Sequence, residues 1–366
     1  MAKKAIRRER VVVAMSGGVD SSVAAALLKE EGYDVIGITM CFNLPDSVGR
    51  RPACCGIQGI EDARRVAHKL GIRHYVLNFK KVLEEKVIKE FCREYLKGRT
   101  PNPCVRCNQY IKFDALLKKA LSLGAGHLAT GHYARIKEVR NQKSGARTFL
   151  LKKAKDKIKD QSYFLYRLGQ GQLKHIFFPL GDYTKDEVRK MARGFSLPVA
   201  DKLASQEICF LTGTDYRGFL KAQGKRYMKP GPVVDKEDNI LGRHQGIAFY
   251  TIGQREGLNI AMGYPVYVIK INPGDNCITV GKKEDVYADE FLVRDTHCIC
   301  AFPKKKVALK VRIRYNHPEA PARVTLSAGK IRVRFNKPQF AVTPGQSAVF
   351  YDKDIVLGGG IIDKVA

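Results

Sequence analysis

The chain has 366 residues, with 65 Lys and Arg against 36 Asp and Glu, which gives a formal net charge of +29. No apolar run reaches the roughly 18 residues of a membrane span, and ten cysteines are too dilute for a disulfide scaffold. The length also excludes one ordinary core, so two or three domains are expected. We expect a soluble cytoplasmic protein, away from membranes, whose positive charge serves RNA or DNA; a solvated basic surface is the alternative.

Strands alternate with amphipathic helices from residue 10 to residue 136. Strands are predicted at 10–15, 33–40, 73–79 and 127–136, and helices at 20–32, 60–71, 80–98 and 110–125. Another helix follows Tyr183, where Thr184 and Glu187 form a capping box. This alternation indicates an α/β fold with a parallel sheet.

The pattern changes near residue 210. From Gly231 onward, short strands are separated by Gly, Pro, Asp and Asn turns, and "KVALKVRIRYNH", "APARVTLSAGKIRVRF" and "SAVFYDKDIVLGGGII" are typical of a small β-barrel. We therefore predict an α/β domain over 1–211, a small central domain over 212–283 and a C-terminal β-barrel over 284–366. The polar stretch 140–147 is predicted to be a hairpin tip.

The stretch "AMSGGVDSS" joins the first strand to the first helix. Glycines let backbone N–H groups approach an anion, and the helix dipole favours negative charge, so this stretch predicts a phosphate-binding loop. It is neither a Walker A loop nor a G-x-G-x-x-G dinucleotide turn. The SGG-x-DS pattern resembles the pyrophosphatase loop (PP-loop) of the adenylating ATPases, which cleave ATP to AMP and pyrophosphate.

The PP-loop resemblance implies an ATP site. Its expected residues are Ala14, Met15, Ser16, Gly17, Gly18, Val19, Asp20, Ser21 and Ser22. Asp20 would lie near Mg²⁺ or the phosphates. Ligands of such sheets bind past the carboxyl ends of the strands, so Met40 and Gly131 are expected near the adenine. For Met40, the alternative is packing in the core. His132, which follows Gly131, is either a site residue or a structural histidine.

The stretch "TPNPCVRCN" holds Cys104 and Cys107. We interpret Asn108 as the N-cap of the following helix. A thiol beside a helix N-terminus has a lowered pKa, which suits a nucleophile or a metal ligand. Cys209 stands alone in "LASQEICFLTG", and a lone cysteine is often a small buried hydrophobe. Four further cysteines are interpreted as structural: Cys54, Cys55, Cys298 and Cys300.

Further motifs follow the loop in one order: "TPNPCVRCN", "GHYAR", "KDQSYFLYRL", "FPLGDYTKDEVR" and "SQEICF". With "CCGIQGIEDARRVA" and "YTIGQREGL", they resemble the bacterial-type tRNA-specific 2-thiouridylases over essentially the full length. The resemblance implies an enzyme that adenylates O2 of the wobble uridine, position 34 of certain tRNAs, and then replaces that oxygen with sulfur. AMP and pyrophosphate are the other products. Base flipping fits this chemistry, since C2 is unreachable in a stacked anticodon loop.

The same resemblance implies roles for single residues. Cys209 would receive a persulfide from a sulfur carrier, and Cys107 would release the sulfur and close a transient disulfide with Cys209. Asn102, Pro103 and Cys104 would line the flipped base. The expected tRNA contacts are Lys159, Asp160, Gln161, Arg314 and Tyr315. From Lys304 to Lys337 there are eleven Lys or Arg and one acid, which suits a nucleic-acid backbone, with a solvated barrel face as the alternative.

Cys104 is a departure, because many family members carry Asp at that position. Cys104, Cys107 and Cys209 together would supply three thiolates and one open coordination position, which suits a [4Fe–4S] cluster. The competing interpretation keeps Cys107 and Cys209 as a persulfide pair. A structural zinc ion ranks third, since it wants a fourth ligand.

Two rival functions stay open. Another adenylating enzyme with the same loop, an amidotransferase or small-molecule ligase, needs neither paired cysteines nor a basic barrel. A non-catalytic RNA-binding protein needs neither an intact loop nor placed cysteines. We expect a monomer.

Overall fold

The computed structural model describes residues 9–42, 56–140, 142, 145–203, 208–211, 215–300, 302, 305–327 and 330–366. It contains two compact units. The first consists of Met1–Lys86, Cys104–Gly213 and Asp354–Val356, and the second of Val87–Pro103, Thr214–Lys353 and Leu357–Ala366. Within the described ranges, no helix combines the length and apolar character needed to cross a membrane.

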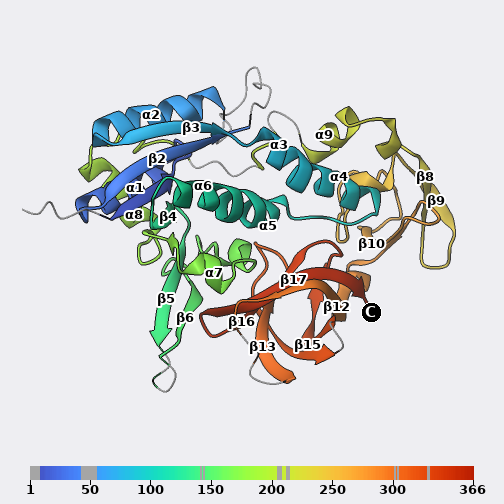
Figure 1. Ribbon diagram of the computed structural model, residues 1–366. Coiled ribbons are helices and arrows are strands. Elements are labelled where there is room, and N and C mark those ends of the chain that lie inside the picture. Colours follow the sequence, from blue (N-terminus) through green and yellow to red (C-terminus); the bar gives the residue numbers. More distant parts are fainter. Residues whose placement is uncertain are drawn as a thin grey trace, which may run out of the picture. The chain divides into compact units, whose positions relative to one another are not determined.

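The first unit is built on a five-stranded parallel sheet with the strand order β3-β2-β1-β4-β7. The strands are β1 Arg10–Ala14, β2 Asp34–Cys41, β3 Arg73–Asn78, β4 His127–Thr130 and β7 Ile176–Phe177. Val11, Val12 and Val13 are all fully buried. Because successive side chains of a strand point to opposite faces, both faces of this sheet are covered. The predicted parallel α/β architecture is confirmed (Figure 1).

Three helices share one hydrophobic core with β1. They are α1 Val19–Glu30, α2 Ile57–Leu70 and α8 Lys185–Gly194. The predicted capping box starts α8, since the Thr184 hydroxyl accepts from the Glu187 N–H at 3.3 Å and the Glu187 carboxylate accepts from the Thr184 N–H at 2.6 Å. The shorter helices are α3 Lys80–Leu83, the π-helical η1 Glu84–Ile88, α4 Lys89–Leu96, the 3₁₀ turn η3 Ser162–Leu165 and α7 Gln170–Leu173.

One helical run carries the C-x-x-C motif. It consists of α5 Pro103–Cys107, the π-helical η2 Asn108–Leu116 and α6 Leu117–Ser122, and α6 packs against β4. Cys107 has helical backbone angles, with φ −59° and ψ −46°, so the predicted N-cap at Asn108 is wrong. The run begins earlier, because proline suits the first position of a helix, where no backbone N–H is needed.

A hairpin follows β4. Its strands, β5 Ala134–Arg140 and β6 Arg147–Lys153, pair antiparallel from Ala134 with Lys153 to Arg140 with Arg147, as the polar stretch between them predicts. The single strand expected over 127–136 is therefore divided at 131–133, where the chain leaves the parallel sheet and enters the hairpin.

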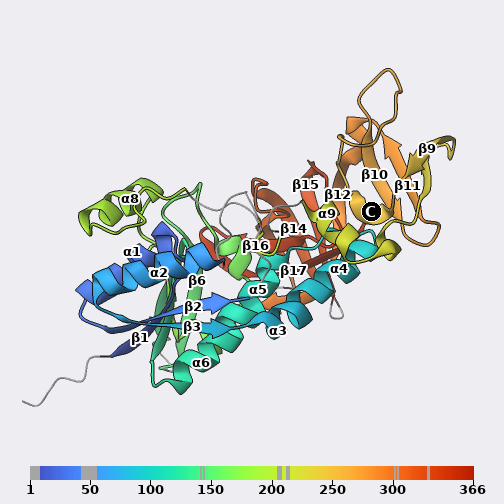
Figure 2. The same cartoon turned by 90° about the horizontal axis from the view of Figure 1, so that it is seen from above.

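The second unit holds two β structures (Figure 2). A four-stranded sheet has the order β10-β11-β8-β9, with β8 Gly231–Val234, β9 Ile240–His244, β10 Tyr267–Asn272 and β11 Cys277–Gly281. A six-stranded barrel runs β12-β15-β14-β13-β16-β17 and closes where β12 pairs with β17. Its strands are β12 Tyr287–Cys298, β13 Lys306–Arg312, β14 Ala320–Ser327, β15 Lys330–Phe340, β16 Ser347–Asp352 and β17 Ile355–Val365.

Alternation explains the barrel. Val311, Val324 and Val333 are buried, whereas Lys310, Arg323 and the neighbouring cations of β15 are exposed, so apolar side chains fill the interior and charged ones face outward. The short helices of this unit are α4, whose bounds are given above, α9 Tyr216–Ala222, η4 Lys225–Tyr227, η5 Ile247–Phe249 and η6 Lys283–Val286. The predicted small central domain and C-terminal barrel are both confirmed as fold elements.

Candidate active site

The phosphate loop between β1 and α1 is held by its own hydrogen bonds. The Ser16 N–H donates to Ser21 Oγ at 3.1 Å, and the hydroxyls of Ser21 and Ser22 donate to the Gly18 carbonyl at 3.2 and 2.8 Å. Gly18 is the N-cap of α1 and brings no side chain to occupy the first N–H groups of the helix. Those donors and the helix dipole therefore make a site for an anion.

Gly17 is required by geometry. Its φ is +70°, and a Cβ atom at this position would lie 2.1 Å from the carbonyl oxygen of Gly59 on α2. Only glycine combines this backbone conformation with such a close approach. The loop is thus held by its contact with α2 and by the hydrogen bonds of its own serines.

Asp20 is oriented from two sides. Its Oδ1 accepts a hydrogen bond from the Tyr133 hydroxyl at 2.8 Å and one from Lys185 Nζ at 2.5 Å. Burial and the neighbouring Asp20 both raise the pKa of Tyr133, which keeps the phenol protonated as a donor. These two donors hold the Asp20 carboxyl group in one position beside the loop.

Gly131 lies directly against the loop. A Cβ atom here would lie 2.7 Å from the Asp20 carbonyl carbon and from the Ser21 nitrogen. The carboxyl ends of β1 and β4, which are neighbours in the sheet, therefore meet at the phosphate loop. This is where the strand order reverses, the place where open α/β sheets bind ligands.

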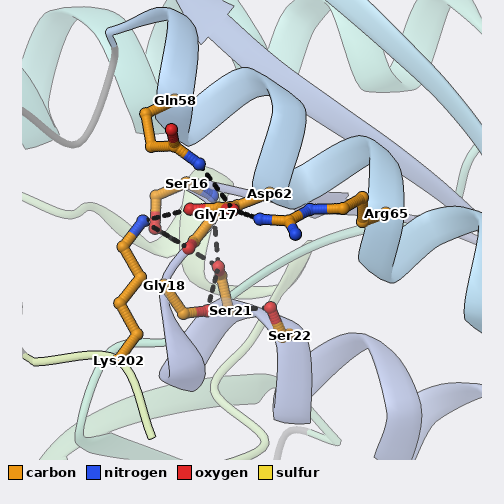
Figure 3. A network of polar contacts seen from close by, with 9 residues as sticks. All are labelled: Ser16, Gly17, Gly18, Ser21, Ser22, Gln58, Asp62, Arg65 and Lys202. Atoms are coloured by element: carbon orange, nitrogen blue, oxygen red, sulfur yellow. Dashed lines mark hydrogen bonds and ion pairs between the residues drawn. The ribbon is translucent and has the colours of Figure 1, made fainter. Parts of the chain in front are cut away.

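A third group of contacts connects α2 to the loop (Figure 3). Asp62 accepts from Lys202 Nζ at 2.5 Å and from Gln58 Nε2 at 3.1 Å, and also from Arg65. Lys202 Nζ donates in addition to the Gly17 carbonyl at 3.1 Å. Burial would raise the pKa of Asp62, but the hydrogen bonds from Lys202, Arg65 and Gln58 lower it below its ordinary value.

The C-x-x-C cysteines are half-buried on α5. Burial raises the pKa of the Cys107 thiol, and the charge of Lys112 opposes the rise without reversing it. The predicted lowering of this pKa is therefore wrong. The reason is that Cys107 lies within the helical run and has no helix N-terminus directly in front of it.

His132 lies close to this helical run. Its Nδ1 contacts the Thr130 hydroxyl at 2.7 Å, and its Nε2 lies 3.5 Å from Lys112 Nζ. Burial, and then the Lys112 charge, lower the pKa of His132 well below its usual range. The imidazole is therefore neutral, as expected of a buried histidine next to a cation.

The three cysteines proposed as metal ligands do not form a ligand cage. Across the described ranges, which include Cys104, Cys107 and Cys209, no three or more His, Cys, Asp or Glu side chains are arranged to hold a metal ion. The [4Fe–4S] cluster on these three cysteines therefore stays a prediction from the sequence.

The other predicted site residues are distributed over both units. In the first unit, Met15 is buried, and Ala14 and Met40 are half-buried at the carboxyl ends of β1 and β2. Asp160 is buried and accepts from the N–H of Ala154 at 3.0 Å and from the Ser162 hydroxyl at 2.9 Å. Gln161 Oε1 accepts from the Tyr133 N–H at 3.0 Å. The side chains of Asp160 and Gln161 thus hold their own segment in place. Of the three residues that begin "KDQSYFLYRL", only Lys159 carries a positive charge.

Asn102 and Pro103 belong to the second unit, as do Arg314 and Tyr315, which follow β13. The Arg314 guanidinium donates to the Thr343 hydroxyl at 2.9 Å, and both Arg314 and Tyr315 are half-buried. Cys54 and Cys55 lie outside the described residues.

Several residues of the site escaped the sequence analysis. Tyr133 and Lys185 lie within "GHYAR" and "YTKDEVR", so the motifs marked their neighbourhoods but not their contact with Asp20. Asp62 lies within "CCGIQGIEDARRVA", but its pairing with Lys202 has no local signal, because it joins a helix to a segment 140 residues further along. Lys112 is spaced on the cysteine helix so as to face His132, which no linear motif reveals.

Three family models match the chain. A tRNA methyl transferase HUP domain matches residues 9–213, a tRNA methyl transferase PRC-barrel domain matches 217–282, and an aminomethyltransferase beta-barrel domain matches 288–362. The tRNA-specific 2-thiouridylase MnmA 2 of Caldanaerobacter subterraneus is 50% identical over 98% of this chain and 99% of its own. The tRNA-specific 2-thiouridylase MnmA of Halothermothrix orenii is 52% identical over 97% and 99%.

The chain belongs to the tRNA-specific 2-thiouridylase family, as its motifs predict. This is a family of enzymes. Among solved structures, a 4-thiouridine synthetase in complex with RNA and ATP is 16% identical over 59% of this chain and 50% of its own, with a TM-score of 0.36. The family assignment rests on these full-length relatives and on the matching family models.

Proposed function

We propose that the protein is an ATP-dependent tRNA-uridine 2-sulfurtransferase acting on the wobble uridine. The observation that carries this proposal is the preorganised phosphate loop. Asp20, fixed by Tyr133 and Lys185, lies in the same unit as the C-x-x-C cysteines and Cys209. An adenylating site and thiols on one unit are what oxygen-to-sulfur exchange requires.

The first step is adenylation. The loop from Ser16 to Ser22 binds the phosphates of ATP, with the adenine past the ends of β2 and β4 near Met40 and Gly131. O2 of the uracil attacks the α-phosphorus, and pyrophosphate leaves. Mg²⁺ accompanies the nucleotide and commonly takes one or two protein carboxylates in addition to phosphate oxygens; Asp20 would supply such an oxygen.

The second step is sulfur transfer. A carrier protein loads Cys209 with a persulfide, whose terminal sulfur attacks C2 of the adenylated base, and AMP departs with the original oxygen. Cys107, as thiolate, then attacks the Cys209 sulfur. The product leaves as 2-thiouridine, a Cys107–Cys209 disulfide forms, and an external thiol reduces it. Since burial raises the pKa of Cys107, its proton has to be taken up by another group before it attacks, and Lys112 as ammonium would stabilise the resulting thiolate.

The tRNA is the polyanionic partner that the net charge of +29 indicates. We assign the flipped base to Asn102, Pro103 and Cys104, and a backbone contact to Lys159, whose neighbours Asp160 and Gln161 hold this segment in place. Arg314 and Tyr315 are assigned to further contacts from the barrel. The enzyme would act as a monomer in the cytoplasm, where tRNA and sulfur carriers meet.

Replacement of Cys209 tests the sulfur step. In Cys209→Ala, 2-thiouridine in the target tRNA should fall to the uncatalysed background, because no persulfide can be carried, while ATP affinity stays within about twofold. Product is measured by mass spectrometry of digested tRNA, and ATP by calorimetry. Cys298→Ala is the matched control, since Cys298 is an exposed cysteine of the barrel and should not matter. Continued thiolation by Cys209→Ala would refute its role.

Replacement of Arg314 tests the barrel. Arg314→Gln should weaken tRNA binding several-fold and reduce the slope of log affinity against log salt by about one, because one phosphate contact is lost. The measurement is a filter-binding titration at several salt concentrations, with Lys353→Gln as a control at a turn of the same unit. An unchanged slope would remove Arg314 from the interface.

A further inference from the structure

Lys202 places an ammonium group at the phosphate loop. Its Nζ lies 3.1 Å from the carbonyl oxygen of Gly17, the residue that gives the loop its shape, and 2.5 Å from Asp62 Oδ2 on α2. In Figure 3 the Lys202 side chain reaches Asp62 and Gly17 together, with the loop serines directly beside them. Asp62 lies in the stretch "CCGIQGIEDARRVA" quoted above, whereas Lys202 belongs to none of the quoted motifs.

The two cations that contact Asp62 differ in their exposure to solvent. Its carboxylate is only 3% exposed and receives hydrogen bonds from two cations, Lys202 and Arg65. The Arg65 side chain is 59% exposed, so water solvates its charge, whereas the Lys202 side chain is only 23% exposed and lies next to a loop whose backbone already favours anions. A phosphate group bound in the loop would therefore meet a partly buried ammonium group, which can donate a charge-assisted hydrogen bond to it.

The backbone that carries Lys202 is firmly placed. The Lys202 N–H donates to the Val199 carbonyl at 3.0 Å, and Leu197, Val199 and Ala200 are packed in the same hydrophobic core as Val19 of α1. The next side chain, Leu203, is 82% exposed. The ammonium is thus held at the loop by a fixed backbone on one side and by Asp62 on the other, an arrangement with little ordering cost on binding.

We propose that Lys202 binds the pyrophosphate portion of ATP and that Asp62 is the residue that positions it. This rests on the proposed cleavage of ATP to AMP and pyrophosphate. As the bond between the α- and β-phosphates breaks, its electron pair stays with the leaving pyrophosphate. Lys202 stabilises that growing negative charge through a charge-assisted hydrogen bond. No proton or covalent bond is transferred to the lysine.

The test compares ligands that contain the β- and γ-phosphates with one that lacks them. Binding of ATP, inorganic pyrophosphate and AMP is measured by calorimetry for the full-length protein and for Lys202→Met. ATP and pyrophosphate should bind about tenfold more weakly to the variant, as expected for one lost charge-assisted hydrogen bond, and AMP should change less than twofold. Lys202→Met is expected to fold, since Asp62 keeps Arg65 and Gln58 as partners.

Two further variants separate binding from structure. Arg65→Met removes the other cation on the same carboxylate, and Arg65 approaches Asp62 from the side opposite to Lys202 (Figure 3), so its ATP affinity should stay near that of the unmodified protein. Lys202→Arg retains the charge and should restore most of the pyrophosphate affinity. In ATP-dependent thiolation, Lys202→Met should raise KM for ATP and lower kcat, since the contact strengthens in the transition state.

Each outcome decides the proposal. Selective loss of ATP and pyrophosphate binding supports it, together with recovery in Lys202→Arg. Equal losses for AMP and ATP, or no loss, or an equal effect of Arg65→Met, would overturn it. The binding measurements need no tRNA, so they stand apart from the proposed function, which fails if the unmodified protein makes no 2-thiouridine.

Discussion

The phosphate loop and the cysteine helix lie in the same unit but are prepared for their tasks to different degrees. The loop has its serines, Gly17 and Asp20 already fixed by hydrogen bonds and by contact with α2 and β4. The cysteine helix carries a thiol whose pKa is raised, and its cysteines do not gather with Cys209 into a ligand cage. Phosphate binding thus depends on a rigid backbone, whereas we infer that the thiols become reactive only when charge or substrate is brought to them.

The loop can be broken at Gly17. Gly17→Ala should reduce ATP affinity and ATP-dependent thiolation by about tenfold to a hundredfold, because the new methyl group meets the Gly59 carbonyl and φ is +70°. Gly32→Ala is a matched control: φ there is +92°, but nothing lies within 4 Å of the added Cβ. Calorimetric titration with ATP checks both. Equal affinities in the two variants would mean that the close contact with α2 is not what shapes the loop.

The connection of the loop to α2 depends on pH through Asp62. Its pKa is lowered below 3.8 in the folded protein, so its stabilising effect is present above its ordinary pKa and is lost as pH falls through the lowered value. Asp62→Asn should reduce the free energy of unfolding by about 1–3 kcal/mol at pH 7, with a smaller deficit below pH 4.

Urea unfolding followed by circular dichroism at several pH values measures this deficit. Asp34→Asn is the comparison, since Asp34 also pairs with arginines, Arg10 and Arg73, but its side chain is 34% exposed. Its deficit should be smaller, as is usual for pairs open to solvent. A deficit for Asp62→Asn that does not change with pH would rule out the ion pair as its cause.

The cysteine helix is expected to tolerate change at its first cysteine. Cys104→Asp should leave the rate of thiolation within about threefold of the unmodified protein, because the persulfide route uses Cys209 and Cys107 as its thiols. The comparison is with Cys107→Ser, which should lose the product. If Cys104→Asp is as damaging as Cys209→Ala, all three thiols are needed together, and iron analysis of anaerobically purified protein becomes the deciding measurement.

The fold and the loop follow from local sequence signals. Three consecutive valines, a glycine turn with hydroxyls and an alanine-rich helix predict the strand, the loop and the helix in order, and the structure confirms them. Gly131 was expected near the site from its position after a strand, and it does lie against the loop. Such features are short in sequence and need no tertiary partner to be recognised.

The cysteine helix shows where local reasoning failed. Asn108 has the residue type of an N-cap, but Pro103 carries the stronger signal for the start of a helix. The lowered pKa predicted for Cys107 depends on a helix that begins at Asn108, and the helical run begins at Pro103 instead. The partners of Asp20 and Asp62 were missed for another reason: Lys185 and Lys202 come from segments 165 and 140 residues away, and only packing brings them there.

The π-helical stretch from Asn108 to Leu116 separates the two cysteines from α6. A π-helix takes more residues per turn than an α-helix, so it acts as an insertion within a helix that otherwise continues. Deleting one residue from an ordinary α-helix would rotate everything beyond it by roughly 100° about the axis, but η2 can lose one residue by relaxing to α-helical geometry. The wide turns of η2 therefore make the orientation of Cys104 and Cys107 tolerant of a single-residue deletion within it, a change that would redirect both thiols in a helix that was α-helical throughout.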